Sequence, residues 1–268
     1  MNCTIRLLVG SLVLLPALGF AQSPGAAPSA PSVAAPIDPI FTTPAESLTP
    51  KQITTLQKLG SDFPQLARYR DANASVAAPA AGERRVVFYG DSITDAWGGR
   101  NNGSQFFPGK PYLNRGISGQ TTAQMVVRFR QDVVELHPAA VLILAGTNDL
   151  AGNTGLSSMQ MIEDNFRSMT EIAQANHIRV ILASVLPVSE YPWRRGVHPA
   201  EQVRTLNAWM KQYAQEHGCI YVDYYSAMTN AEGGMDRTLA SDGVHPTAAG
   251  YGIMAPLAEK GIQQAFAR

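Results

Sequence analysis

From Arg84 onward, the chain alternates between short apolar runs and longer stretches with helical periodicity. The apolar runs are rich in β-branched residues and nearly continuous, as expected for parallel strands that are covered on both faces. They lie at residues 86–90, 112–117, 140–146, 179–188 and 220–225. The helical stretches have the length of crossover connections and lie at residues 121–136, 157–176, 199–217 and 247–266. This β-α series predicts a doubly wound α/β fold with five parallel strands.

The first residues have the pattern of an export signal. Arg6 is the only charged residue before Asp38, and an uninterrupted, largely apolar run from Leu7 to Phe20 follows it. Small residues at 19 and 21 fit a cleavage site after Ala21. The run is short for a membrane span, although an uncleaved anchor is the alternative. We therefore expect residues 1–21 to be a signal peptide and the mature protein to be secreted or periplasmic.

Two further segments precede the alternating region. Residues 22–47 are rich in Ala, Pro and Ser and are expected to form a flexible linker. Residues 48–83 are expected to form a helical extension, because Thr49-Pro50 has the pattern of a helix start. Apolar residues at helical spacing then predict a short amphipathic helix that packs against the domain at 84–268, namely Ile53, Leu56 and Leu59.

Charge and cysteine content exclude several classes of protein. Lys+Arg and Asp+Glu both number 21, so no net charge attracts nucleic acid or an anionic membrane. Of the two cysteines, Cys3 lies inside the predicted signal, which leaves Cys219 without an intramolecular disulfide partner. No Cys/His cluster has zinc-site spacing and no phosphate-binding Gly-Lys-Ser/Thr motif occurs, so we expect neither metal nor cofactor.

Four short polar motifs lie at the ends of predicted strands or before the last helix. They are GDSIT at 90–94, NRG at 114–116, GTND at 146–149 and DGVHP at 242–246. In open α/β sheets, ligands bind outside the carboxyl ends of the strands. We therefore expect the four motifs to converge on one site.

The residues in these motifs can perform nucleophilic catalysis. A serine hydroxyl needs a base to take its proton, and His245 can serve as the base for Ser92. Asp242, three residues before His245, can hold the imidazole in the required tautomer. The developing oxyanion needs donors, which the backbone N–H groups of Ser92 and Gly116 and the side-chain amide of Asn148 can supply.

Each of these residues can also serve an ordinary structural role. Asp91 and Ser92 can cap a helix, and so can Asn148. Gly116 can serve a turn alone, and Asp-Gly at 242–243 is a common turn pair. Taken together, however, four motifs in this order at strand ends favour a catalytic site.

With these motifs the sequence resembles the SGNH hydrolase family, also called GDSL-like lipases and esterases. The resemblance covers residues 84–268, with Ile93 in place of the leucine of the family's name. It implies a flavodoxin-like, three-layer α/β/α sandwich around a central parallel sheet. It also implies a triad of Ser92, Asp242 and His245, with an oxyanion hole of Ser92, Gly116 and Asn148. Esters are the substrates of the family.

Two loops after the first and fourth strands carry aromatic residues that can form a sugar-stacking platform, an acyl groove or ordinary packing. The candidate substrate contacts are Trp97, Phe106, Tyr191 and Trp193. Neither loop is long or apolar enough to predict a lid for long-chain lipid. Short acyl groups, such as acetyl esters of carbohydrate or small aryl esters, are therefore favoured.

The sequence predicts a serine esterase that hydrolyses carboxylic esters through an acyl-enzyme at Ser92. One alternative is an acyltransferase that moves acetyl groups to a glycan hydroxyl with the same triad. A second alternative, from another class, is a non-catalytic carbohydrate-binding protein. The expected partner is a small-molecule, glycan or lipid ester, with no nucleic acid and no stable membrane insertion after signal cleavage.

Overall fold

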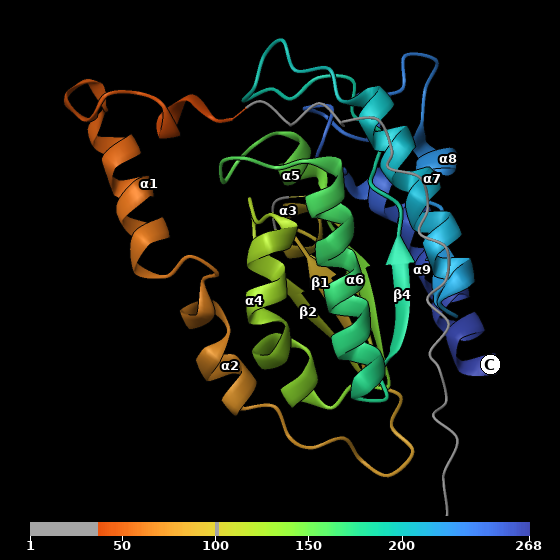
Figure 1. Cartoon of the computed structure of the whole chain (residues 1–268). Helices are drawn as coiled ribbons and strands as arrows, with labels where there is room; N and C mark the ends of the chain where they lie inside the picture. The colour runs from red at the N-terminus through yellow and green to blue at the C-terminus, as the bar shows by residue number, and fades with distance from the viewer. Residues whose placement is uncertain (1–36, 100–101) are drawn as a thin grey trace, which may run out of the picture. The chain divides into compact units, whose positions relative to one another are not determined.

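The computed structural model describes residues 37–99 and 102–268, with a central sheet of five parallel strands (Figure 1). The predicted signal peptide and the linker residues before 37 lie outside the described residues. The strands are β1 (Val86–Gly90), β2 (Tyr112–Gly116), β3 (Ala140–Leu144), β4 (Arg179–Ala183) and β5 (Ile220–Val222). Their spatial order is β2-β1-β3-β4-β5, which is the flavodoxin-like order, so the predicted fold class is confirmed.

Alternate residues of each strand point to opposite faces of the sheet and enter two separate hydrophobic clusters. Val87 and Tyr89 of β1 belong to the first cluster, whereas Val86 and Phe88 belong to the second. Because both faces are buried, the strands have nearly continuous apolar sequences. This is why the strands could be predicted without an alternating pattern.

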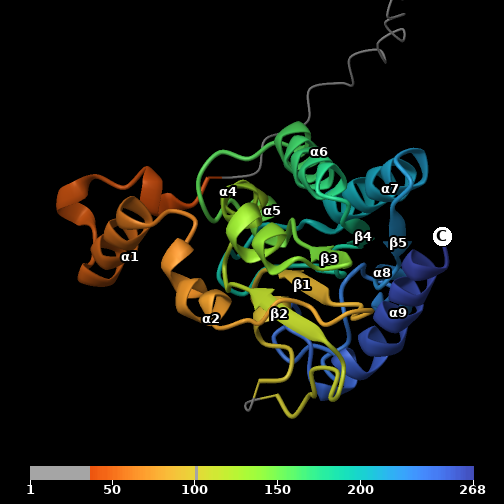
Figure 2. The same cartoon turned by 90° about the horizontal axis from the view of Figure 1, so that it is seen from below.

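Helices cover both faces of the sheet, as Figure 2 shows. The first hydrophobic cluster is completed by α4 (Thr122–Asp132), α6 (Met159–Ala175) and α7 (Ala200–Glu216). The second is completed mainly by α9 (Ala248–Ala267), with a contribution from α8 (Tyr225–Met228). The result is the three-layer sandwich that the sequence resemblance implied.

Four strands end earlier than predicted, and two of them, β4 and β5, end three or more residues early. The predicted strand 179–188 ends at Ala183, and beyond it the Asn207 side chain of α7 bonds both the N–H and the C=O of Val185, at 2.8 and 2.9 Å. A side chain thus replaces the neighbouring strand. The predicted strand 220–225 ends at Val222, because Asp223 accepts the N–H of Ser226 and turns the chain into α8.

Two one-turn helices follow directly after strands. They are α3 (Ser92–Asp95), after β1, and α5 (Thr147–Leu150), after β3. Asp91 caps α3 by accepting the N–H of Ile93 at 3.0 Å. These short helices place Ser92 and Asn148 at the carboxyl edge of the sheet.

The extension before the sheet contains α1 (Pro50–Ser61) and α2 (Arg70–Ala74). Thr49 and Gln52 form a capping box at the start of α1, which confirms the predicted helix start. The predicted packing of this helix is wrong, because α1 has no buried residue and Ile53 is 41% exposed. Instead, polar and backbone groups of residues 63–75 contact the domain. Three 3₁₀ turns complete this region, at Pro39–Phe41, Ala45–Ser47 and Leu66–Arg68.

In the described part of the chain, no helix is both long and apolar enough to cross a membrane.

Cys219 is buried with 3% of its surface exposed, and burial raises the pKa of its thiol to about 11. It therefore behaves as a small core residue.

Candidate active site

Ser92, His245 and Asp242 form a continuous chain of hydrogen bonds. The distance from Ser92 Oγ to His245 Nε2 is 2.9 Å, and that from His245 Nδ1 to Asp242 Oδ2 is 2.6 Å. When Nδ1–H donates to the carboxylate, Nε2 is left to accept the serine proton. Ser92 comes from the end of β1 and the other two residues from the loop before α9, so the structure brings together the three predicted residues.

The loop that carries Asp242 and His245 is organised by Asp242 itself. Asp242 Oδ1 accepts the N–H groups of Val244 at 2.9 Å and His245 at 2.8 Å. Burial alone would raise the pKa of Asp242, but the His245 ring and these two N–H groups outweigh burial and lower it. The carboxylate is therefore ionised at neutral pH and can stabilise a protonated His245.

Asn148 is buried and oriented by three partners. Its Nδ2 donates to the carbonyl of Gln120 at 3.0 Å and lies 3.4 Å from Asp91 Oδ2. Its Oδ1 accepts from Asn153 Nδ2 at 2.7 Å. The alternative role of Asn148 as a helix cap is not observed, because Oδ1 accepts from a side chain and not from a backbone N–H. The amide is held as a donor beside Ser92.

Close packing between β2 and α3 explains why residue 116 is a glycine. Its N–H donates to Asn114 Oδ1 at 2.9 Å. A Cβ atom at Gly116 would lie 2.1 Å from the Asp95 nitrogen, so glycine allows β2 and α3 to approach closely. The structure thus places the predicted donor Gly116 at a strand-helix contact, with its N–H already used.

Gly119, three residues later, has the properties of a donor that the sequence analysis missed. Its φ of +80° favours glycine, and a Cβ atom there would meet nothing within 4 Å. Among the described residues, no hydrogen-bond acceptor pairs with its N–H or with that of Ser92. The Asn148 amide contacts Gln120 and Asp91, which are the chain neighbours of Gly119 and Ser92. These contacts bring the three segments together.

Two buried carboxyl groups support the same region. Asp149 accepts the N–H and the hydroxyl of Thr122 and so fastens the start of α4 to α5. Burial raises the pKa of Asp149 to about 7, against the effect of these hydrogen bonds. Burial likewise raises the pKa of Asp91 to about 6, opposed by the N–H of Ile93.

The four candidate substrate contacts have different environments. Trp97 is 3% exposed and Tyr191 is fully buried, so neither presents a surface to a substrate. Phe106 is half-buried and packs edge-on against Phe88, with ring centroids 5.1 Å apart. These three aromatic residues therefore serve mainly in ordinary packing.

Trp193 is 41% exposed and lies beside His245. The two ring centroids are 6.0 Å apart, and Trp193 Nε1 donates to Asn153 Oδ1 at 3.1 Å. Tyr191 packs beneath it, with ring centroids 5.1 Å apart. Of the four residues, Trp193 has the exposure and location that a substrate contact requires.

Within residues 37–99 and 102–268, no group of three or more His, Cys, Asp or Glu residues is arranged to hold a metal ion. Ser92, His245, Asp242 and Asn148 are arranged so that they can perform nucleophilic acyl transfer, which needs a nucleophile, a base, an orienting carboxylate and a preorganised donor.

Comparisons with known proteins agree with this chemistry. The model of the GDSL-like Lipase/Acylhydrolase family matches residues 88–253. The acetylxylan esterase of Geobacillus stearothermophilus is 27% identical over 203 residues, which cover 64% of this chain and 90% of that protein. Esterase TesA of Pseudomonas aeruginosa is 29% identical over 142 residues, 51% of this chain and 62% of that protein.

Among solved structures, a GDSL-like lipase of Bacteroides thetaiotaomicron matches with a TM-score of 0.72 and 43% identity. The match covers 76% of this chain and 99% of that one. The family and these relatives support the activity of a carboxylic ester hydrolase.

Proposed function

Because this chain belongs to the GDSL-like Lipase/Acylhydrolase family, we propose that it is a serine esterase that hydrolyses short-chain carboxylic esters through an acyl-enzyme at Ser92. The observation that carries the proposal is the hydrogen-bond chain from Ser92 through His245 to Asp242. This geometry supplies a nucleophile, a base within reach of its proton and a carboxylate that fixes the base.

In the proposed reaction, His245 Nε2 takes the proton of Ser92 as Oγ attacks the ester carbonyl carbon. The carbonyl π electrons move to oxygen and form the tetrahedral oxyanion. When the oxyanion collapses, the C–O bond to the alcohol breaks and His245 donates its proton to the leaving oxygen. Water then attacks the acyl-enzyme by the same sequence, releasing the acid and restoring Ser92.

We assign the oxyanion contacts to the N–H groups of Ser92 and Gly119 and to the amide of Asn148. Gly119 replaces Gly116 in this assignment, because the N–H of Gly116 is already donated to Asn114. One hydrogen of Asn148 Nδ2 is donated to the Gln120 carbonyl at 3.0 Å, whereas the other makes only a long contact of 3.4 Å with Asp91 Oδ2. We assign this second hydrogen to the oxyanion. Donors fixed before the reaction stabilise charge that appears only in the transition state.

For the substrate, we propose acetyl or similarly short esters carried on carbohydrate. Trp193 offers an exposed aromatic face beside His245, and aromatic faces stack on sugar rings. One relative that matches over 64% of this chain is an acetylxylan esterase. Tyr191 and Asn153 hold Trp193 in place, so its ring is a preformed surface.

A panel of substrates tests the proposal. Purified protein is mixed with aryl esters of increasing acyl length, acetylated xylooligosaccharides and lysophospholipids, and release of the free acid is measured. We expect the highest kcat/KM with acetyl or other short acyl groups and loss of turnover in Ser92→Ala. The control Ser168→Ala, which removes a hydroxyl on α6 bonded to the Asp164 carbonyl, should keep normal turnover. Absence of turnover with every ester would contradict the proposal. Acetylated sugar formed from an added acceptor would identify the alternative transferase.

We also propose that the protein is exported and that cleavage follows Ala21. The support is the charge at Arg6, the apolar run at 7–20 and the small residues at 19 and 21. Protein recovered from outside the cytoplasm should begin at Gln22 when its N-terminus is sequenced. Recovery of the full-length chain from the cytoplasm would contradict export.

A further inference from the structure

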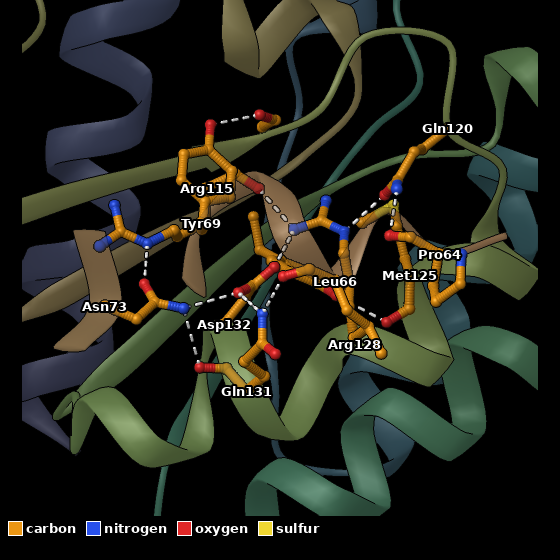
Figure 3. A network of polar contacts seen from close by, with 12 residues as sticks. Pro64, Leu66, Tyr69, Asn73, Arg115, Gln120, Met125, Arg128, Gln131 and Asp132 are labelled. Carbon is orange, nitrogen blue, oxygen red and sulfur yellow. Dashed lines mark hydrogen bonds and ion pairs between the residues drawn. The ribbon is translucent and has the colours of Figure 1, made fainter. Parts of the chain in front are cut away.

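The segment at residues 63–75 lies against the loop at 116–121, which carries Gly119. Figure 3 shows Pro64 of this segment beside Gln120 of the loop. We propose that this segment, here called the brace, positions the oxyanion donors and so contributes to catalysis without touching the substrate. The proposal rests on the proposed function, since it assigns a role to residues outside the chain of hydrogen bonds from Ser92 to Asp242.

The first contact of the brace is with Gly116. The Tyr69 hydroxyl donates to the Gly116 carbonyl, at the point where β2 becomes the loop. The guanidinium of Arg115 lies 4.9 Å from the centre of the Tyr69 ring and fixes its position. Burial, and then the nearby Asp95 carboxylate, raises the pKa of Tyr69, so the phenol keeps the proton that it donates.

The second contact is with Gln120, the residue after Gly119. Its side chain is fully buried, and Nε2 donates to the Pro64 carbonyl of the brace at 2.7 Å. Its Oε1 accepts from Arg128. The backbone carbonyl of Gln120 accepts the Asn148 amide, so the brace and the proposed oxyanion donor are joined through one residue.

The third contact reaches Ser118, the residue before Gly119. The N–H and hydroxyl of Ser118 donate to Asp95 Oδ2 at 3.1 and 2.6 Å. Asp95 is also 3.5 Å from the Arg68 guanidinium of the brace. Both neighbours of Gly119 are therefore anchored, and its own N–H is left for a ligand.

The brace is itself fixed to the domain by polar contacts. Asn73 donates to Asp132 Oδ1 and accepts from Arg115 Nε, both at 2.7 Å. Asp132 pairs with Arg128 at 3.0 Å, with both side chains fully buried, as Figure 3 shows. Arg128 also donates to Gln120, so these contacts connect the brace to the loop at 116–121 a second time.

The brace contacts the domain through polar groups and does not contribute to its hydrophobic core. No side chain of residues 63–75 belongs to either hydrophobic cluster of the domain. Its contacts with the loop are hydrogen bonds to backbone and amide groups, which fix orientation. Preorganised donors need such fixing, because small displacements from the productive geometry reduce the rate strongly.

The experiment compares Tyr69→Phe with Tyr112→Phe in the full chain. Tyr69→Phe keeps the ring and removes the donor to Gly116, whereas Tyr112→Phe removes a hydroxyl contact to Glu259 away from the oxyanion loop. We expect Tyr69→Phe to lower kcat about 10-fold with KM nearly unchanged, less than the ~10²–10³-fold loss of a whole oxyanion donor. Arg68→Gln combined with Tyr69→Phe is expected to lower kcat further.

A transition-state analogue supplies the readout that a purely structural role would not move. A boronic acid forms a tetrahedral adduct with an active-site serine, and its inhibition constant should rise in parallel with the loss of kcat. Tyr112→Phe should leave both values unchanged. A normal kcat in both Tyr69→Phe and the double variant would contradict the proposed role of the brace and leave the proposed esterase activity unaffected. A loss that follows only the melting temperature, or that appears equally in Tyr112→Phe, would overturn it too. Failure of the proposed function is distinct, because the unmodified protein would then turn over no ester.

Discussion

The site has two halves that are built differently. The proton-transfer half, Asp242 and His245, is held by contacts within one short loop, and its side chains are 39% and 36% exposed. In the oxyanion half, Gly119 is exposed, but Asn148 and Gln120, which support it, are almost fully buried and are held by residues from distant parts of the sequence. The comparison teaches that each half has the environment that its chemistry requires.

A base that exchanges protons with an alcohol and with water must be reachable. Local hydrogen bonds to Asp242 are enough to set its tautomer. Oxyanion donors gain most in a water-excluded region where they need not reorganise during the reaction. The oxyanion half therefore requires a buried network, and Asn148, Gln120 and Arg128 provide one.

The largest effect is expected in the exposed half. Asp242→Asn replaces the acceptor of the His245 Nδ1 proton by an amide that can favour the wrong tautomer. We expect kcat to fall roughly 10³–10⁴-fold with the fold intact. Asp223→Asn is the matched control, because Asp223 organises a similar turn at Ser226 and does not contact His245 or Ser92 through any hydrogen bond of the described residues. A rate near that of the unmodified protein would remove Asp242 from its orienting role.

A somewhat smaller effect is expected in the buried half. Asn148→Ala removes one oxyanion donor and should lower kcat about 10²–10³-fold, with KM little changed. Asn148→Asp keeps the shape but replaces the donor by an acceptor, so its loss should be at least as large. Measuring kcat, KM and thermal stability of both variants separates catalysis from folding. A folded Asn148→Asp protein with nearly normal kcat would exclude the donor role.

Trp193 contacts both halves, through His245 and through Asn153. If its ring stacks on sugar, Trp193→Ala should raise KM for an acetylated xylooligosaccharide by about 3–10-fold. Trp193→Phe keeps an aromatic face but loses the Nε1 contact to Asn153, and should retain most of the sugar affinity. Equal KM values for glycan ester in all three proteins would show that the ring does not bind the sugar.

The smallest effect concerns stability and pH. The pKa of Asp242 is lowered in the folded protein, so its ionised form stabilises the fold above the unfolded pKa of ~3.9. This contribution is lost as pH falls through the lower folded pKa. The difference in melting temperature between the unmodified protein and Asp242→Asn should therefore shrink as the pH falls below the unfolded pKa of ~3.9. A difference independent of pH would contradict this linkage.

The sheet could be predicted because the central strands β1, β3 and β4 are almost entirely buried. The core of each predicted strand is present, and the two largest differences in strand length arise from Asn207 and Asp223, whose roles depend on tertiary contacts. The hydrogen-bonded chain of Ser92, His245 and Asp242 could be predicted because chemistry restricts which residues can serve. Serine, histidine and aspartate at the edge of one sheet match the three roles that nucleophilic catalysis requires.

The remaining features depend on contacts that the sequence does not encode locally. Gly116 ends β2 and Gly119 lies three residues later, and the bonded N–H of Gly116 and the left-handed backbone of Gly119 distinguish the two. Trp97 and Trp193 both lie in polar loops, yet one is buried and the other exposed. Tyr69 of the brace donates to the backbone carbonyl of Gly116. Every residue has such a carbonyl, so this contact produces no recognisable sequence motif.

The central claim is that Ser92 is the nucleophile, and covalent labelling tests it most directly. The protein is treated with an organophosphate or a sulfonyl fluoride, digested, and the modified peptide is identified by mass spectrometry. Ser118 is the informative competitor, because it lies in the same loop as Gly119 and its hydroxyl is bonded to Asp95. We predict a single label on Ser92, inactivation in proportion to labelling, and no label in Ser92→Ala. A label on Ser118, or inactivation that persists in Ser92→Ala together with residual turnover, would contradict the assignment of Ser92.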